Sequence, residues 1–309
     1  MKKTFRLILF AFLAFSVTFT SCKKSDTTPA ENSDLATHTE DQSRFSAETD
    51  DVDNDANVAI DANGAFEGKV ETPIGSICNA TVVLDSTATL RRLTITYNGL
   101  NCAGNRLRTG TVVHTMPLGQ HWRDAGAVIT STITNLKITR VIDNKSITIN
   151  GVHEVKNVTG GRLGQLALLG TIVHEITSNG MNVTFDNGTT RSWQVAKRRT
   201  FTYNNGIVIS TVGIHTDGST TGISEWGTNR FGNAFVTVIV DPMTIRQDCG
   251  FRLVSGQISH QRLSANVTVT FGLDSTGMPT TCPGIGQSFY YKLVYTGANG
   301  IVRTYILPY

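Results

Sequence analysis

Charged residues are scarce in this sequence. They make up 17% of the 309 residues, whereas soluble domains typically carry about 25%. This low fraction excludes a chain that is kept disordered by its charge. The sequence also lacks any heptad stretch rich in Ala, Glu, Lys and Leu, so a coiled coil is excluded as well.

Long apolar runs are missing after the first twenty residues. No later segment approaches the roughly 18 consecutive apolar residues that indicate a transmembrane helix. Near the start, Leu7–Phe19 is an apolar run that follows Lys2, Lys3 and Arg6. The run is too short to span a bilayer, and together with the preceding basic residues it predicts a signal peptide over residues 1–21.

Two signatures of chemistry are absent too. No Cys-x-x-Cys pair and no close Cys/His spacing occurs, so the sequence does not predict a zinc site. No Gly-x-Ser-x-Gly motif occurs either, which excludes the nucleophile elbow of α/β-hydrolases. We therefore predict no cofactor and no metal, and we nominate no catalytic residue.

The segment Phe19-Thr20-Ser21-Cys22 follows the apolar run directly. It resembles the lipobox of bacterial lipoproteins, with Phe19 where Leu is commonest. The resemblance implies cleavage before Cys22 and attachment of lipid, such as palmitate, to that residue. Two or more acyl chains would hold the protein stably in a leaflet. An ordinary secretory signal with an incidental cysteine is the alternative.

Four further cysteines are present, an even number that is typical of disulfides in an exported protein. We favour the pairs Cys78–Cys102 and Cys249–Cys282, because each pair closes a short loop around a hairpin-like stretch. The other two connectivities, and four unpaired thiols, remain open.

Residues 22–64 differ in character from the rest of the chain. They contain eleven Asp or Glu and only three Lys or Arg. This composition predicts a lipid-anchored acidic tether that is disordered from residue 23 to about 39. Apolar residues at roughly helical spacing within 40–61 predict one short acidic helix.

Acidic residues also alternate at Asp51, Asp53 and Asp55, as they do in a calcium loop. Ala56, however, stands where an EF-hand loop needs Gly, and Ala62 stands where it needs a bidentate Glu. A solvated acidic spacer is the preferred interpretation.

After Gly64 the pattern is that of β-strands. Polar and apolar residues alternate within 92–97 and 266–271, which places Thr on one face and apolar side chains on the other. Similar runs predict further strands near residues 80–85, 106–116, 127–140, 146–158, 168–177, 181–186, 191–203, 207–215, 220–228, 234–240, 250–260, 287–295 and 301–307.

Asn-Gly pairs, the strongest short signal for a hairpin turn, stand at 98–99, 179–180, 187–188, 205–206 and 299–300. Short connections join antiparallel neighbours, whereas parallel strands need crossovers of about a dozen residues. The sequence therefore predicts an all-β fold over 65–309. It would be an antiparallel meander that forms an extended sheet, a sandwich or a barrel-like domain, in one piece or in two halves.

Five histidines follow a glycine closely in predicted strands: His114, His153, His174, His215 and His260. They could hold a metal if their strands were adjacent and their side chains shared a face. No His-x-His or His-x-x-x-His spacing brings two of them together locally. We interpret them as polar residues on the solvent face of the sheet.

Two acids and three tryptophans are candidates for polysaccharide chemistry. Glu154 and Glu175 could face each other at the separation of about 5–9.5 Å that a glycosidase needs, although exposed strand positions explain them equally well. Trp122, Trp193 and Trp226 could stack on sugar rings. Single tryptophans in β domains are more often core residues, which is the preferred interpretation here.

Charge separates along the chain. Residues 22–64 carry −8 (3 basic minus 11 acidic), and residues 65–309 carry +8 (21 minus 13). The densest basic spot is Lys197-Arg198-Arg199, where the first and third side chains share a strand face with Arg191 nearby. A polyanion such as an acidic glycan could dock there. Solvated, charge-protected strand edges are the preferred interpretation.

Three segments resemble a group of uncharacterised lipoproteins that are common in Bacteroidota. They are Ile95-Thr-Tyr-Asn-Gly-Leu-Asn-Cys102 with Arg106-Leu-Arg-Thr-Gly110, Trp226-Gly-Thr-Asn-Arg230-Phe-Gly-Asn, and Cys249-Gly-Phe-Arg-Leu-Val-Ser-Gly256. The resemblance implies a lipoprotein of the outer membrane. The group has no assigned activity or site residues to carry over.

We therefore expect an envelope-anchored lipoprotein with a non-catalytic binding or scaffolding β domain. Its expected partners are the outer membrane, through Cys22, and a glycan or an envelope protein; nucleic acid is not expected for an exported chain. A polysaccharide-acting hydrolase of the cell envelope is the alternative. The ligand, and the side of the outer membrane that the domain faces, remain open.

Overall fold

The computed structural model describes residues 28–63, 77–261, 265–284, 287–297 and 300–309. They form one long helix and one antiparallel sheet of fifteen strands, so the all-β prediction is confirmed for the described part of 65–309. The elements are α1 (Thr28–Asn63), β1 (Ala80–Ser86), β2 (Leu90–Leu100), β3 (Arg106–Pro117), β4 (Ala127–Arg140), β5 (Ser146–Asn157), a 3₁₀ turn (Leu163–Gln165), α2 (Leu166–Leu169), β6 (Thr171–Phe185), β7 (Thr190–Tyr203), β8 (Ile207–Gly213), β9 (His215–Asp217), β10 (Thr220–Thr228), β11 (Ala234–Arg246), a second 3₁₀ turn (Gln247–Cys249), β12 (Arg252–Gln261), β13 (Ala265–Leu273), β14 (Tyr290–Gly297) and β15 (Val302–Pro308).

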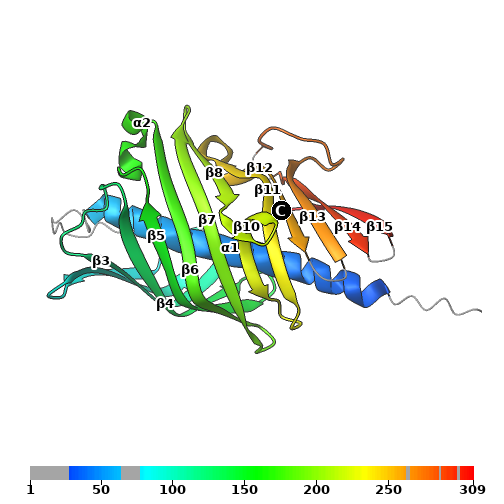
Figure 1. Ribbon diagram of the computed structural model, residues 1–309, viewed down its shortest axis with the longest axis horizontal. Coiled ribbons are helices and arrows are strands. Elements are labelled where there is room, and N and C mark those ends of the chain that lie inside the picture. Colours follow the sequence, from blue (N-terminus) through cyan, green and yellow to red (C-terminus); the bar gives the residue numbers. More distant parts are fainter. Residues whose placement is uncertain (1–27, 64–76, 262–264, 285–286, 298–299) are drawn as a thin grey trace, which may run out of the picture.

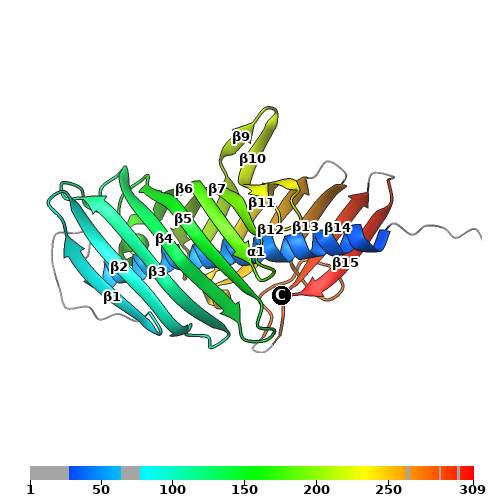
Figure 2. The same ribbon diagram turned by 90° about the horizontal axis from the view of Figure 1, so that it is seen from below.

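The sheet is a meander that is interrupted once, near its middle. Strands β1 to β7 pair in chain order, and so do β10 to β15. Between β7 and β11, β8 pairs along one half of each strand and β10 along the other half. The β9–β10 hairpin projects from the sheet (Figure 2). Within the described residues β1 and β15 each pair with one neighbour, so they are the two edges of an open sheet.

Helix α1 lies along the concave face of the sheet and crosses the strands one after another (Figure 1). Leu35 packs with buried residues of β11 to β14. Phe45 contacts Trp193 of β7, and Asp55 binds Arg108 of β3. At about 1.5 Å per residue the 36 residues span about 54 Å. Thirteen side-by-side strands about 4.8 Å apart span about 58 Å, so helix and sheet match in length.

The predicted period of two is present in the strands. Along 92–97 and 266–271, every second residue is buried toward α1 and the residues between them are partly or fully exposed. The Thr-rich face is therefore the outer, convex face of the sheet. The largest fully buried side chains, which mark the centre of the core, are Trp122, Trp193, Phe45, Phe235, Phe289, Ile60, Leu93, Ile95, Met116, Leu136 and Ile138.

The Asn-Gly predictions have mixed outcomes. Residues 187–188 and 205–206 are the turns between β6 and β7 and between β7 and β8, as predicted. The pairs 98–99 and 179–180 lie inside β2 and β6, so the hairpin prediction is wrong there. Gly99 (φ +150°) and Gly180 (φ +74°) take their positive φ within continuous strands. Residue 299 lies outside the described residues.

Glycines inside strands allow the sheet to curl. The register shifts at Gly110 in β3 and at Gly151 in β5. A Cβ at Gly110 would lie 2.3 Å from the carbonyl oxygen of Asn135, and one at Gly151 would lie 2.6 Å from the Cα of Met181. Only glycine fits this close approach, and such bulges bend the strands around the helix.

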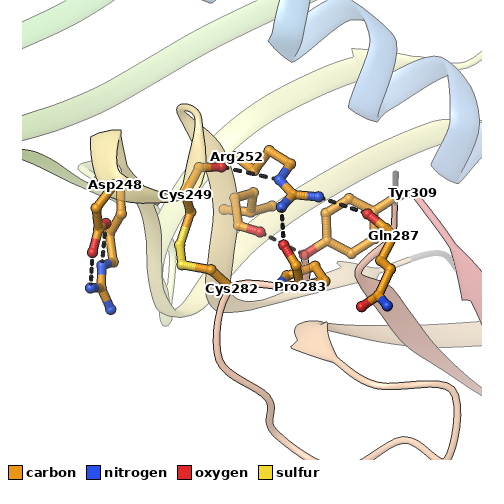
Figure 3. The surroundings of a disulfide bond; sticks show 9 residues. Asp248, Cys249, Arg252, Cys282, Pro283, Gln287 and Tyr309 are labelled. Atoms are coloured by element: carbon orange, nitrogen blue, oxygen red, sulfur yellow. Dashed lines mark hydrogen bonds and ion pairs between the residues drawn. A yellow bond between two sulfur atoms is a disulfide. The ribbon is translucent and has the colours of Figure 1, made fainter. Parts of the chain in front are cut away.

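Both favoured cysteine pairs lie at disulfide distance. The Cα atoms of Cys78 and Cys102 are 5.2 Å apart, and those of Cys249 and Cys282 are 5.4 Å apart. Beside the second pair, Arg252 donates hydrogen bonds to three backbone carbonyls, one of them that of Cys249 (Figure 3). The loop before β14 is thereby fastened to β12.

Helix α1 differs from the expected tether. It begins at Thr28, inside the segment assigned to disorder, and it is 36 residues long rather than short. The interpretation as a solvated spacer is wrong, because Asp41, Glu48 and Asp53 are buried against the sheet. Within the described residues, no helix combines the length and the apolar character that crossing a membrane requires. Residues 1–27, with the signal peptide and Cys22, lie outside the described residues, so lipid attachment stays a prediction.

Candidate functional site: the polar interface beneath the helix

Helix α1 has no continuous apolar face. It buries Leu35, Phe45, Val52, Ala59 and Ile60, but polar and charged residues are buried between them. The concave face of the sheet offers matching groups to these residues. We use the name polar interface for fifteen of the buried polar residues of α1 and of the facing strands: His38, Asp41, Arg44, Glu48, Asp53, Arg108, His114, Ser131, His153, His174, Lys197, Arg199, Glu225, Thr237 and His260.

Asp53 lies at the centre of this interface. Its Oδ1 atom is 2.7 Å from Nε2 of His153 on β5, and its Oδ2 atom is 3.7 Å from Nη1 of Arg199 on β7. Burial alone would raise the pKa of Asp53, but His153 and Arg199 outweigh it and hold the pKa below the usual 3.8. Asp53 is therefore an ionised acid on the helix, held by bases on the sheet.

A serine lies between two histidines on neighbouring strands. Ser131 of β4 is the cross-strand partner of His114 on β3 and of His153 on β5. Its hydroxyl is 2.8 Å from Nδ1 of His114, whose pKa is lowered to about 3 by burial and by the nearby His153. Asp53 bonds to His153 rather than to His114. Acid, base and hydroxyl are thus not arranged as a nucleophilic triad.

A second buried group joins α1 to β7 and β10. Lys197 Nζ lies 2.6 Å from Glu225 Oε1, and Trp193 Nε1 donates to Glu225 Oε2 at 2.9 Å. Ser46 of α1 accepts a hydrogen bond from Lys197 at 2.6 Å and donates one to Glu225. Burial raises the pKa of Glu225, but Lys197 and the hydrogen bonds outweigh it, and the pKa lies below 4.5. The ion pair is fully satisfied.

The remaining buried histidines pack among aromatic rings. His260 Nδ1 is 3.0 Å from the hydroxyl of Thr237, and its ring lies 5.0 Å from that of His38. His174 lies between Trp122 and Phe201, with ring centroids 5.1 and 5.0 Å away. Burial lowers the pKa of both His174 and His260 to about 4, so both are neutral at neutral pH.

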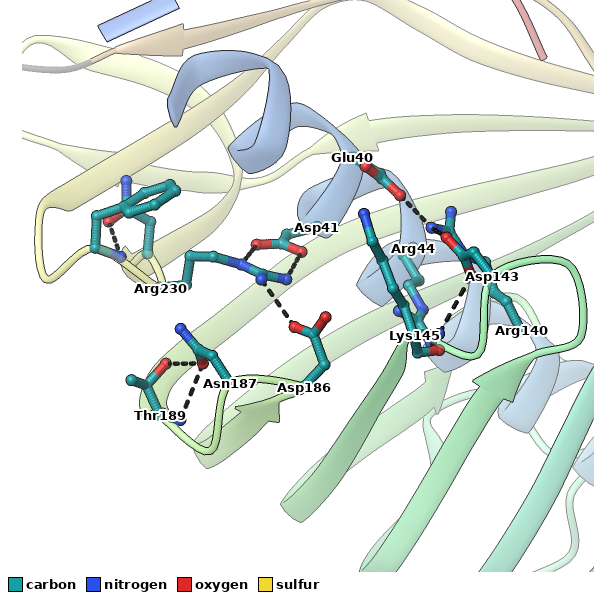
Figure 4. A network of polar contacts seen from close by, with 12 residues as sticks. Glu40, Asp41, Arg44, Arg140, Asp143, Lys145, Asp186, Asn187, Thr189 and Arg230 are labelled. Carbon is teal, nitrogen blue, oxygen red and sulfur yellow. Dashed lines mark hydrogen bonds and ion pairs between the residues drawn. The ribbon is translucent and has the colours of Figure 1, made fainter. Parts of the chain in front are cut away.

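Arginines at the rim hold the N-terminal half of α1. Arg230 makes two 2.6 Å hydrogen bonds to Asp41 and one of 2.8 Å to Asp186 in the β6–β7 turn (Figure 4). Arg140, in turn, binds Glu40 of α1 at 2.5 Å. In the opposite direction, Arg44 of α1 donates to backbone carbonyls of the sheet. The β10–β11 turn and the end of β4 thus contact the helix by charge, and Asp186 of the β6–β7 turn supports Arg230.

The C-terminal half of α1 is held in the same way. Arg106 lies 2.8 Å from Glu48, and Arg108 lies 2.9 Å from Asp55, which also accepts a 2.9 Å hydrogen bond from Tyr97. Burial raises the pKa of Glu48 to about 7, against the opposing effect of Arg106. Acids of α1 are therefore matched to cations of the sheet along its length.

The histidine prediction is wrong for four of the five residues. His114, His153, His174 and His260 face the helix and are buried, because their strands curl around α1. His215 is partly exposed and stacks on Trp226 at 4.0 Å. The core interpretation of Trp122 and Trp193 is confirmed, whereas Trp226 is only half-buried.

The basic cluster does not meet solvent as expected. Lys197 and Arg199 do share a face with each other, but this face is buried: Arg199 pairs with Asp50 of α1, and Lys197 pairs with Glu225 of β10 beneath α1. Of the two candidate acids, Glu154 is exposed and Glu175 pairs with Arg198 on the convex face. The alternating acids 51–57 lie in a helix rather than a loop, so they cannot form an EF-hand.

The described residues contain one group with the ligand spacing of a metal site: Asp248, Cys249 and Cys282. Its two cysteines are joined to each other, so neither can supply a thiolate. This group does not fit a metal.

His38, Asp41 and Glu225 of the polar interface, and Arg230 at its rim, were not identified from the sequence. None of them stands in a local motif. The signal that could have found their partnership is the opposite charge of residues 22–64 and 65–309, which suggests that the first segment binds the second.

No family model matches the chain, and the comparisons with curated proteins and with solved structures give no significant match.

Proposed function

We propose that this protein is an outer-membrane lipoprotein, anchored through Cys22, whose β domain is a non-catalytic binding or scaffolding module. One observation supports the proposal that the β domain is non-catalytic. Four titratable residues that could perform chemistry, Asp53, His114, His153 and Glu225, are buried beneath α1. Asp53 binds His153, Glu225 binds Lys197, and Nδ1 of His114 lies at hydrogen-bond distance from Ser131.

The space at this interface supports the same proposal. A cavity of about 10 Å³ lies between α1 and β5 to β7, beside Asp53, His153 and Lys197. That volume is on the scale of a single water molecule, whereas pockets for small ligands typically measure about 300–1,000 Å³. A glycan or a protein partner would therefore bind to the outer surface of the domain.

The proposed anchor can be tested by labelling cells with radioactive palmitate. We expect the label on the wild-type chain and none on the Cys22→Ala variant. A Cys249→Ala/Cys282→Ala variant is the matched control, because it also loses cysteines but keeps Cys22, and it should stay labelled. Equal labelling of wild type and Cys22→Ala would contradict the anchor.

The binding role is tested against the hydrolase alternative in one experiment. The protein is incubated with insoluble envelope polysaccharide, and both co-sedimentation and the release of reducing ends are measured. We expect co-sedimentation without release. Release that disappears in Glu154→Gln or Glu175→Gln, the two acids on the convex face, would establish the hydrolase instead.

A further inference from the structure

The C-terminal part of the chain has the composition of a membrane-facing surface. Five of the seven tyrosines lie within residues 290–309. Residues 252–309 contain four Lys or Arg (Arg252, Arg262, Lys292 and Arg303) and one acid, Asp274. Tyrosine is enriched where proteins meet the headgroup region of a bilayer, and basic side chains are attracted to anionic lipids there.

Strand β15 carries one of these tyrosines, Tyr305, and one of these basic residues, Arg303. It is an edge strand that pairs only with β14 among the described residues. Val302 is 60% exposed, Tyr305 is 42% exposed and Leu307 is 41% exposed. Tyr305 and Leu307 stand opposite Leu293 and Tyr291, so they extend the concave apolar face beyond the part that packs with Leu35 of α1.

The position of β15 relative to the start of α1 suggests what covers it. Both views place β14 and β15 at the end of the molecule where α1 begins (Figures 1 and 2). Thr28 is six residues after Cys22, and six residues reach at most about 22 Å when fully extended. An anchor at Cys22 would therefore hold this end of the molecule close to the bilayer.

We propose that edge strand β15 rests on the lipid surface of the membrane that carries the anchor. Tyr305 and Leu307, which share one face of β15, contact the boundary between headgroups and acyl chains, and Arg303 on the same face lies near anionic headgroups. The inference builds on the proposed lipid anchor, which sets the orientation. It adds a second contact with the membrane, made by the folded domain.

The experiment measures binding to vesicles without the anchor. The chain from Lys23 to Tyr309 keeps every residue that the structure describes and lacks only the signal peptide and Cys22. It is mixed with vesicles of phosphatidylethanolamine and phosphatidylglycerol and separated by flotation. Binding should weaken about tenfold in Tyr305→Ser/Leu307→Ser, because it scales with the apolar area buried in the membrane.

A matched control comes from the opposite edge of the sheet. Val83 on β1 is 50% exposed and Leu118 after β3 is 37% exposed. The Val83→Ser/Leu118→Ser variant loses two exposed apolar side chains as well, but we expect it to bind vesicles like the wild type. Circular dichroism should show the same β-sheet spectrum for both variants.

Three outcomes would overturn the proposal. They are absence of vesicle binding by the unmodified chain, equal loss of binding in both double variants, and lipid-free dimers that dissociate in Tyr305→Ser/Leu307→Ser without any vesicle binding. The last outcome would assign β15 to strand pairing between two copies. Palmitate labelling tests the anchor separately, so failure of the anchor and failure of this surface give different results.

Discussion

Two ion pairs of equal length show how location decides what a charged residue contributes to the stability of the fold. Lys197–Glu225 and Arg198–Glu175 both measure 2.6 Å, and their cations are neighbours on β7. Because adjacent strand residues point to opposite faces, the first pair is buried beneath α1 and the second lies on the convex face. A buried charge that loses its partner keeps its desolvation cost, whereas an exposed one returns to water.

We therefore expect Glu225→Gln to lower the free energy of unfolding by about 3 kcal/mol or more, since Lys197 would remain buried without a counter-charge. The matched change Glu175→Gln should cost less than about 1 kcal/mol. Urea unfolding curves of the two variants measure the difference. Equal midpoints would contradict the assignment of Glu225 as the essential partner of Lys197.

At the scale of elements, the strands could be predicted from sequence, whereas the sequence predicts only a short helix within 40–61 and not the full length of α1. Alternation within 92–97 or 266–271 is visible without knowing the fold, because each strand buries one face whatever its partner. Helix α1 lacks the apolar stripe that normally indicates a buried helix. The acidic side chains of α1 can be buried because cationic side chains from distant strands pair with them. Residue pairs such as Asp41 and Arg230 are brought together only by the folded sheet.

The rim contacts should control how firmly α1 is held. We expect Arg230→Ala to increase amide hydrogen exchange in residues 35–45 of α1 while leaving β13 and β14 protected, because Asp41 loses both hydrogen bonds to the sheet. Arg246→Ala, which removes an exposed pair with Asp248, is the control and should leave α1 unchanged. Unaltered exchange in both variants would show that the apolar contacts suffice.

At the scale of the whole molecule, the buried histidines couple stability to pH. The pKa is lowered to about 3 for His114 and to about 4 for His174 and His260, mainly by burial, whereas an unfolded chain takes up these protons near pH 6.5. The contribution of these histidines to the free energy of unfolding is complete above about pH 6.5 and is lost as the pH falls toward 4. Glu48, whose pKa burial raises to about 7, acts in the opposite direction, and so do Asp41, Asp51 and Asp55, whose pKa values burial raises from 3.8.

We expect the urea midpoint to fall between pH 7 and pH 5, because the unfolded chain protonates three histidines in this interval that the folded chain keeps neutral, whereas the large opposing shift among the buried acids is that of Glu48. His260→Gln should reduce this dependence on pH. The control is His121→Gln, which changes a partly exposed histidine. This variant should show the same dependence of the urea midpoint on pH as the wild type. Identical midpoints of the wild type at the two pH values would contradict the prediction.

The match between the 36-residue helix and the thirteen-strand row constrains how this architecture can change in evolution. Gaining one more hairpin would widen the row by two strand spacings, about 9.6 Å. To keep such a hairpin covered, the helix would have to lengthen by about six residues, close to two turns. An insertion that adds strands therefore calls for a compensating insertion in the helix. The lengths of helix α1 and of the strand row are expected to vary together among descendants of this chain.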